Sequence, residues 1–196
     1  MTKMNNKEAG EQQEAPKKSM GREVLEMVVY ILIVAALTWL LVTFVGQRTV
    51  VSGRSMNPTL ENGDNLITDK ISYRFSDPKR YDIVVFPFED ENGKRNFIKR
   101  IIGLPGETVQ IKDGEVYING ELLGETYGKE KMDYAGRASE PITLGDDEYF
   151  VLGDNRNDSS DSRDPAVGNV TRSQIIGKAW LRIWPLNKIG LINHRE

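Results

Sequence analysis

The chain has 196 residues and a formal net charge of −3, with no basic stripe that would indicate a nucleic-acid partner. It has no cysteine, which excludes disulfides, thiolate metal sites and a cysteine nucleophile. Its single histidine, His194, lies close to the C-terminus, where no scaffold would hold it as a catalytic base or a metal ligand. Any hydrolytic chemistry therefore needs Lys, Asp, Glu or a metal-bound water as base, and we expect neither a resident metal nor a cofactor.

The first predicted element is a membrane-spanning helix. Residues Met27–Gln47 form an uncharged, mostly apolar run, which at about 1.5 Å per residue is roughly as long as a bilayer core is thick. A cleaved signal sequence is usually shorter and ends in small residues, so we expect a retained anchor over 22–47. Residues 1–21 are polar and predicted to be a disordered cytoplasmic tail. Residues 48–196 would then form a domain outside the plasma membrane.

The pattern of residues 48–196 is that of a β protein. Runs rich in β-branched and aromatic residues predict strands at Thr49–Val51, Asn65–Asp69, Asp82–Phe86, Asn96–Ile102, Thr108–Lys112, Glu115–Ile118, Glu148–Leu152 and Lys178–Ile183. Tight turns are predicted at Asn92-Gly93, Asp113-Gly114 and Asn119-Gly120. A single short helix is expected, around Arg172–Ile175. The predicted fold is mostly β, an antiparallel sheet or barrel-like catalytic domain with one N-terminal transmembrane helix.

Ser55 lies in the turn-rich segment VVSGRSMNPTLENGD, a few residues after the apolar run. The glycines and the proline of this segment would expose the hydroxyl beside free backbone N–H groups. A nucleophile and an oxyanion site need that arrangement. The segment alone, however, favours an ordinary turn serine.

Lys99 lies in the predicted strand of NFIKRIIGLPGE, where it shares one face with Phe97 and Ile101. Burial between apolar neighbours would lower the pKa of its ammonium, so that a neutral amine could accept a proton from a serine. Lowering that pKa from about 10.4 to about 7 costs roughly 4–5 kcal/mol, which a folded domain tolerates. Taken alone, the segment favours an edge-strand lysine whose amine reaches solvent.

The segment VLGDNRNDSSDSRDP, over Val151–Pro165, places many short polar side chains directly after an apolar strand. It lacks the central Gly and the terminal Glu of an EF-hand-like calcium loop. A solvated loop is one interpretation. The other is an internal network in which Asp161 pairs with Arg163 and Ser159 orients a nearby amine.

Taken together, in order and spacing, these segments resemble the motifs of type I signal peptidases. SGRSMNPTL is similar to the nucleophile motif, YDIVVF to the next motif, FIKRIIGLPGE to the lysine motif and GDNRNDSSDSR to the last. The likeness extends from the apolar run to about Trp184. A single span and a short domain resemble the Gram-positive members.

The resemblance implies a role for each matching residue. Ser55 would be the acyl-forming nucleophile and Lys99 the general base. Ser159 would hydrogen-bond the Lys99 amine, and Asp161 and Arg163 would form a supporting salt bridge.

The resemblance also implies the surroundings of the site. Gly153 would allow close packing behind it, and backbone N–H groups of Ser55 and Gly53 would bind the oxyanion. Many Gram-negative members have a serine where this chain has Gly53, and Tyr81 stands where the family usually has glycine. The pockets for small side chains before the cleavage point would be lined by Val51, Ser52, Leu60, Phe97 and Ile98.

The expected function is removal of N-terminal signal peptides from translocated preproteins after A-x-A-like sites. The expected partners are preprotein signal peptides and the lipid bilayer, without nucleic acid and without an obligate protein partner. One alternative is a maturation peptidase dedicated to one substrate. Another is a membrane-displayed β module that binds cell-wall or secreted ligands and needs no activated serine. Self-cleaving repressors share the Ser–Lys chemistry, but the span and the lack of a DNA-binding half argue against them.

Overall fold

The computed structural model describes residues 20–44, 46–91, 93–128 and 130–192. The chain divides into two compact units, residues 1–40 and 41–196. Almost all of the tail expected over 1–21 lies outside the described residues, as do Asn92 of one predicted turn and His194.

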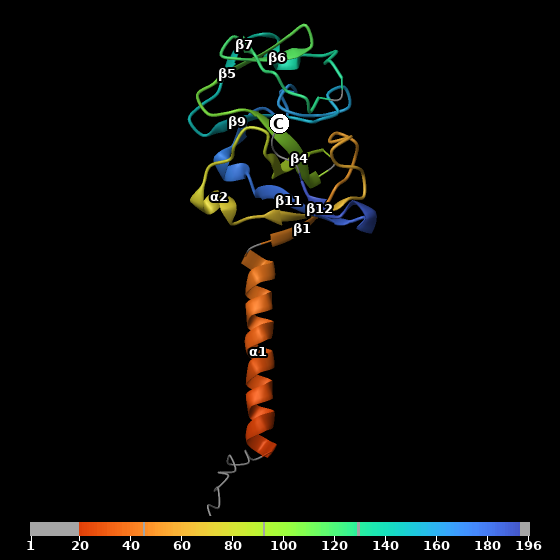
Figure 1. The fold of residues 1–196 in the computed structure, drawn as a ribbon. Helices are drawn as coiled ribbons and strands as arrows, with labels where there is room; N and C mark the ends of the chain where they lie inside the picture. The colour runs from red at the N-terminus through yellow and green to blue at the C-terminus, as the bar shows by residue number, and fades with distance from the viewer. Residues whose placement is uncertain (1–19, 45, 92, 129, 193–196) are drawn as a thin grey trace, which may run out of the picture. The chain divides into compact units, whose positions relative to one another are not determined.

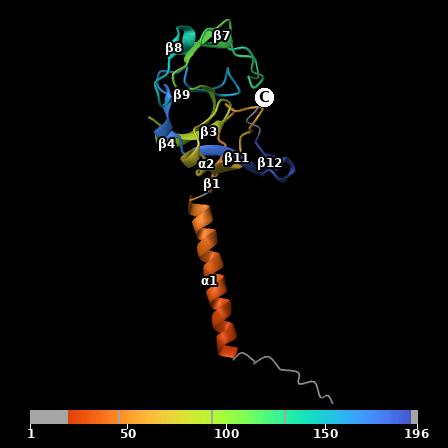
Figure 2. The ribbon, with the colours of Figure 1, turned by 60° about the vertical axis from the view of Figure 1, so that its left-hand side comes forward.

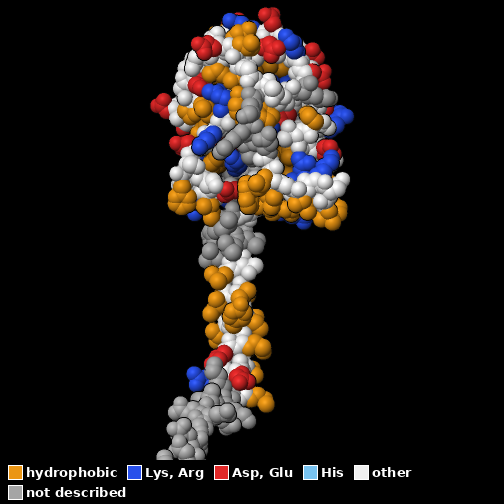
Figure 3. All heavy atoms as spheres, in the orientation of Figure 1, with side chains coloured by type: hydrophobic (Ala, Val, Ile, Leu, Met, Phe, Trp, Pro, Cys, Tyr) orange, Lys and Arg blue, Asp and Glu red, His pale blue; other side chains and the backbone are white. Residues whose placement is uncertain are grey.

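The helix α1, Met20–Phe44, begins in the first unit and occupies most of the region expected as an anchor. Its described side chains are largely apolar and exposed, from Val24 to Trp39, as the hydrophobic colouring along the helix in Figure 3 indicates. Among the residues that the structure describes, none of the helices is both long enough and apolar enough to cross a membrane.

The second unit is built from two antiparallel sheets (Figures 1 and 2). The larger sheet follows the order β1 (Gly46–Val50), β2 (Asn65–Asp69), β11 (Gly177–Trp184), β3 (Ile83–Asp90), β4 (Gly93–Gly103), β9 (Glu148–Leu152) and β10 (Val170–Thr171), and β12 (Gly190–Leu191) pairs with β11. The smaller sheet follows the order β7 (Glu121–Leu122), β6 (Glu115–Ile118), β5 (Thr108–Lys112) and β8 (Ile142–Thr143). In the described chain, the end strands of each sheet do not pair with one another, so the barrel-like closure predicted from the sequence is wrong.

The predicted strands correspond closely to the observed ones. The bounds of β2, β5, β6 and β9 match the predictions, whereas β3 and β4 are longer because their pairing continues from Ile83–Arg100 out to Asp90–Gly93 through exposed and half-buried residues. Asp113 and Asn119 have φ values of 52° and are followed by glycines with positive φ, as the predicted tight turns require.

Four short helices lie between the strands: α2 (Ser72–Phe75), η1 (Gly136–Ser139), η2 (Arg172–Gln174) and η3 (Leu186–Lys188). Only η2 was predicted from the sequence.

The second half of the strand β4 is buried on both faces. Its residues Ile98, Ile101 and Ile102 belong to three different buried hydrophobic clusters. Because a side chain on this strand has packed neighbours on both faces, its position is tightly fixed.

Arg100 of β4 forms a buried ion pair with Asp154, in the loop after β9. Both side chains are 0% exposed, and the guanidinium donates from Nε to Oδ1 at 2.8 Å and from Nη2 to Oδ2 at 2.7 Å. The Thr59 hydroxyl also donates to Asp154, and the Tyr127 ring lies 3.5 Å from the guanidinium carbon. The pair thus joins the strand of Lys99, the polar loop and the segment that follows Ser55.

Tyr81 occupies a backbone conformation that favours glycine, with a φ of 70°. A left-handed conformation costs an ordinary residue roughly 1–2 kcal/mol, which is consistent with the glycine that the family resemblance leads us to expect at this position. In this chain the Tyr81 carbonyl accepts a hydrogen bond of 2.9 Å from Arg100 Nη1, and its ring packs against Tyr127 with centroids 5.3 Å apart. These contacts offset the backbone strain.

We predict that Arg100→Leu destabilises the domain by about 3–5 kcal/mol, because it leaves the Asp154 carboxylate buried without its cation. Thermal unfolding of the full chain in detergent measures this loss. The matched control is Lys94→Ala, which removes an exposed ion pair to Glu89 whose side chains are 78% and 66% exposed, and should cost less than about 1 kcal/mol. Equal melting temperatures for the two variants would contradict the prediction.

Candidate active site

Ser55 and Lys99 meet at the floor of a cleft. Ser55 lies in the turn after β1, and Lys99 lies in the middle of β4. The Lys99 Nζ is 2.7 Å from Ser55 Oγ, and the lysine residue is only 4% exposed. The structure therefore brings a hydroxyl and a buried amine from distant parts of the sequence into hydrogen-bond contact.

Burial changes the proton affinity of Lys99. Loss of hydration lowers the pKa of this amine from 10.5 to about 8, and the charge of Arg95 acts in the same direction. The carboxylates of Asp161 and Asp154 raise the pKa and oppose part of this shift. A substantial fraction of Lys99 is therefore neutral near pH 8, which general-base chemistry requires.

The polar loop after β9 holds the backbone of the Ser55 segment. The Asn155 N–H donates to the Ser55 carbonyl at 3.0 Å, and its side-chain amide donates to the Arg54 carbonyl at 3.3 Å. A Cβ at Gly153 would lie 2.5 Å from the Ser55 carbonyl oxygen and 2.3 Å from Ser159 Oγ. Such distances admit no side chain, so glycine is required for the loop to approach Ser55.

Asp161 and Arg163 form a second buried ion pair in the same loop. The guanidinium donates from Nε to Oδ1 at 2.8 Å and from Nη2 to Oδ2 at 2.9 Å. Asp161 also accepts a hydrogen bond of 3.1 Å from the Gly153 N–H. The pair therefore fixes the glycine that contacts Ser55.

Ser159 does not make the hydrogen bond to Lys99 that its motif implies. Its Oγ is buried and has no hydrogen-bond partner among the described residues. It nevertheless lines the same cleft as Ser55 and Lys99. An unpaired buried hydroxyl is costly, so this atom is available to a group that enters the cleft.

The backbone donors near Ser55 differ in their availability. The Gly53 N–H donates to Asn62 Oδ1 at 2.9 Å, so it is already used within the protein. The Ser55 N–H takes part in none of the turn hydrogen bonds of its segment. Of the two N–H groups expected to bind an oxyanion, only that of Ser55 is not used in a hydrogen bond of this turn.

The cleft has a volume of about 440 Å³, and Ser52, Phe97 and Ile98 are among the residues that line it. Val51 and Leu60 are buried in the hydrophobic cluster that also contains Ile98. The structure therefore places three of the five expected pocket residues in the cleft wall and the other two in the core.

Several residues that shape the site were missed by the sequence analysis. Arg100 and Asp154 form the central ion pair. Asn62 accepts a hydrogen bond from the Gly53 N–H, which was expected to be available to an oxyanion. A signal existed for Arg100, because it shares a strand face with Ile98 and Ile102, and a charge on a buried face needs a partner. No comparable pattern marks Asn62, since its contact depends on the path of the turn.

We predict that Lys99→Met stabilises the protein more at pH 7 than at pH 10.5. Because the folded-state pKa of Lys99 is lowered, the penalty for burying its charge is fully present below about pH 8 and is lost as the pH rises toward 10.5. Methionine carries no charge at either pH, so its advantage should shrink by about 3 kcal/mol across this window. Melting temperatures of both proteins at the two pH values test this, and a difference independent of pH would contradict it.

The chain is similar in sequence to known proteins. Residues 24–184 match the family model described as signal peptidase, peptidase S26. Signal peptidase I of Leptolyngbya laminosa is 47% identical over 154 residues, covering 76% of this chain and 73% of that protein. The probable signal peptidase I-2 of Synechocystis sp. is 40% identical over 196 residues, covering 98% and 86%.

A solved structure is also similar. The crystal structure of a signal peptidase I from Enterococcus faecalis has 36% identity, covers 53% of this chain and 97% of that one, and superposes with a TM-score of 0.44. The family match and the length and identity of the sequence alignments together place the chain: it belongs to the signal peptidase I family of serine peptidases.

Proposed function

We propose that this protein removes signal peptides from translocated preproteins through an acyl-enzyme on Ser55, with Lys99 as general base. The observation that carries the proposal is the 2.7 Å contact between Lys99 Nζ and Ser55 Oγ in a cleft. The lowered pKa of the lysine supports the base role, because a neutral amine has to be present near physiological pH.

The proposed reaction has two halves. Neutral Lys99 takes the proton of Ser55 as Oγ attacks the scissile carbonyl carbon, and the resulting lysine ammonium returns that proton to the leaving amine as the C–N bond breaks. Water then attacks the ester while Lys99 accepts a proton from it. Collapse of this second intermediate breaks the ester bond, releases the signal peptide as a carboxylic acid and returns the proton to Ser55.

The oxyanion formed in each half needs hydrogen-bond donors. The Ser55 N–H is the proposed backbone donor, since the Gly53 N–H is bonded to Asn62. Ser159 is proposed to orient the Lys99 amine once substrate fills the cleft, because its hydroxyl is buried beside the site and unpaired among the described residues. Asp161 and Arg163 support the loop that contains Ser159.

The substrate is proposed to bind as an added strand between the 51–53 segment and β4. The exposed Ser52 and the residues Phe97 and Ile98 line the cleft there, and backbone pairing would supply affinity without side-chain specificity. Val51 and Leu60 pack behind this wall and limit the depth of a pocket to small side chains. An A-x-A-like cleavage motif fits such a wall.

We also propose that α1 anchors the protein in the plasma membrane, with its N-terminus cytoplasmic and the peptidase domain outside. The support is the uncharged sequence Met27–Gln47, most of which α1 contains. Exposed apolar side chains from β11 to β12 offer the peptidase domain a surface for lipid: Trp180, Trp184, Leu186, Ile189 and Leu191. Figure 3 shows hydrophobic side chains at the margin of the domain where Figure 1 places β11 and β12.

We predict that Ser55→Ala abolishes cleavage and that Lys99→Ala lowers kcat/KM by about 10²–10⁴-fold, the usual contribution of a general base. The assay uses the full chain in detergent and several unrelated preproteins with A-x-A sites. Lys94→Ala removes an exposed lysine of the same strand and should retain activity. Cleavage by a folded Ser55→Ala variant would refute the proposal, and cleavage of one preprotein alone would favour a dedicated maturation peptidase.

We predict that kcat/KM rises with pH through an apparent pKa near 8, because the amine of Lys99 acts in its neutral form. In Arg95→Ala, this rise in kcat/KM should occur at higher pH, since the Arg95 charge helps to keep the pKa of Lys99 low. Initial rates at low substrate concentration between pH 6 and 10 test both statements. If the rise in kcat/KM occurs at the same pH or at lower pH in the variant, Lys99 is not the group that titrates.

A further inference from the structure

We propose that an ion pair between Arg54 and Asp158 allows the cleft to accept either charge at the first residue after the scissile bond. The inference rests on the proposed function, because it concerns the half of the cleft that would receive the leaving part of the substrate. Arg54 directly precedes Ser55, and Asp158 directly precedes Ser159. Each charge is therefore one residue away from a side chain at the centre of the site.

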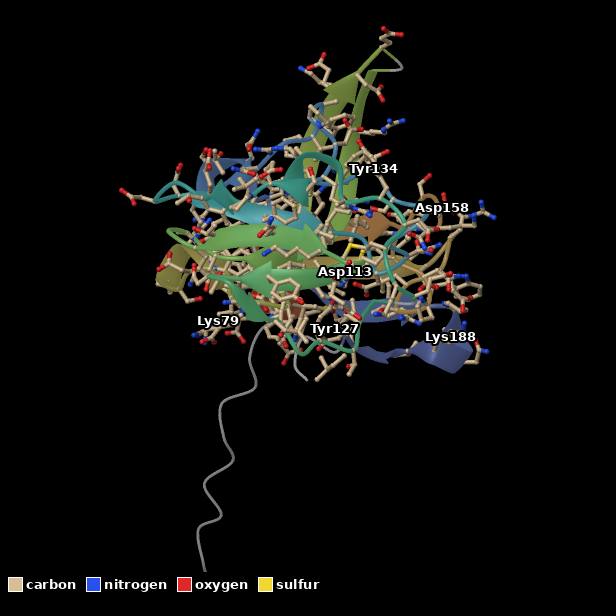
Figure 4. The ribbon with its side chains drawn as sticks, turned by 90° about the horizontal axis from the view of Figure 1, so that it is seen from above. Lys79, Asp113, Tyr127, Tyr134, Asp158 and Lys188 are labelled. Carbon is tan, nitrogen blue, oxygen red and sulfur yellow. The ribbon has the colours of Figure 1, made fainter. Side chains whose placement is uncertain are left out.

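The ion pair lies in the wall of the cleft and in contact with solvent. Arg54 Nε is 3.1 Å from Asp158 Oδ2, and the two side chains are 75% and 52% exposed. Both residues line the cleft, and Figure 4 shows Asp158 at the outer rim of the domain. A group that leaves the cleft on this side passes the pair.

The direction of the bound substrate follows from the two ends of the cleft. The walls formed by Ser52–Gly53 and by Asn96–Ile98 would hold the residues before the scissile bond, as proposed above. The remaining lining beyond Ser55 consists of Arg54 and residues 157–160. In the proposed binding mode, the residues after the scissile bond lie along this remaining part of the lining, past Arg54 and Asp158.

The residues that line the cleft have a net charge of zero when Lys99 is neutral. The charged residues that line it are Arg54, Asp158 and Lys99, and Lys99 is neutral in the proposed reactive state. Because an exposed ion pair is weak, a charged substrate side chain can replace either partner. The intact pair thus accepts both signs, whereas the loss of one partner leaves the cleft with a charge of its own.

The test uses the full chain in detergent and three preproteins that differ only in the first residue after the A-x-A site, which is Lys, Gln or Glu. The measured quantity is the ratio of kcat/KM for the Lys substrate to that for the Glu substrate. We expect this ratio to rise about 2–5-fold in Arg54→Ala and to fall about 2–5-fold in Asp158→Asn, the effect of one exposed charge. The double variant Arg54→Asp with Asp158→Arg should return it toward the wild-type value.

Two controls separate this effect from a general loss of activity. Lys94→Ala removes a comparably exposed ion pair outside the cleft lining and should leave the ratio unchanged. About 1 M salt should bring the ratios of both Arg54→Ala and Asp158→Asn toward that of the wild type, because exposed charges are screened. Variants that lower all three rates equally, with an unchanged ratio, would overturn the inference, whereas a wild-type chain that cleaves none of the three would overturn the proposed function itself.

Discussion

The ion pair between Arg100 and Asp154 is the interaction on which the candidate site depends. It is fully buried and joins the strand that holds Lys99 to the loop that contacts Ser55, and the Thr59 hydroxyl connects the segment that follows Ser55 to the same carboxylate. Buried ion pairs rarely increase stability over apolar packing, but they disfavour every arrangement that leaves a charge unpaired. Here that penalty opposes any separation of the three segments. The buried core therefore fixes the position of the Ser55 hydroxyl relative to the Lys99 amine.

The same buried environment lowers the pKa of Lys99, and this coupling connects stability to chemistry. An amine held between apolar neighbours loses hydration, which costs folding free energy below about pH 8 and makes the neutral base available near that pH. The carboxylates of Asp161 and Asp154 moderate the shift. Two ion pairs therefore have two effects each: they hold the loop in place, and they limit how far the lysine pKa falls.

The sequence was sufficient for the parts of the molecule that local patterns determine. Runs of β-branched and aromatic residues, with Asp113-Gly114 and Asn119-Gly120 after them, predicted β5, β6 and their turns. The order of the motifs predicted that Ser55 and Lys99 lie in one site. It was insufficient where a contact depends on the path of the chain. Strand pattern cannot tell whether the end strands of a sheet pair, so closure was predicted wrongly. Likewise, no local signal shows that Asn62 accepts a hydrogen bond from the Gly53 N–H, or that the Ser159 hydroxyl has no partner among the described residues.

The neighbouring positions of Lys99 and Arg100 have a consequence for how β4 is aligned. Their side chains point to opposite faces of one strand, and the register with β3 places Val84 opposite Lys99 and Ile83 opposite Arg100. A slip by one residue would turn the guanidinium toward the cleft and the shorter amine toward Asp154, so the two hydrogen bonds from Arg100 to Asp154 would be lost. An arginine cannot lose its proton at any pH that the protein survives. The register of this hairpin therefore decides which of the two cations faces Ser55, and a misaligned chain would place there the one that cannot become neutral.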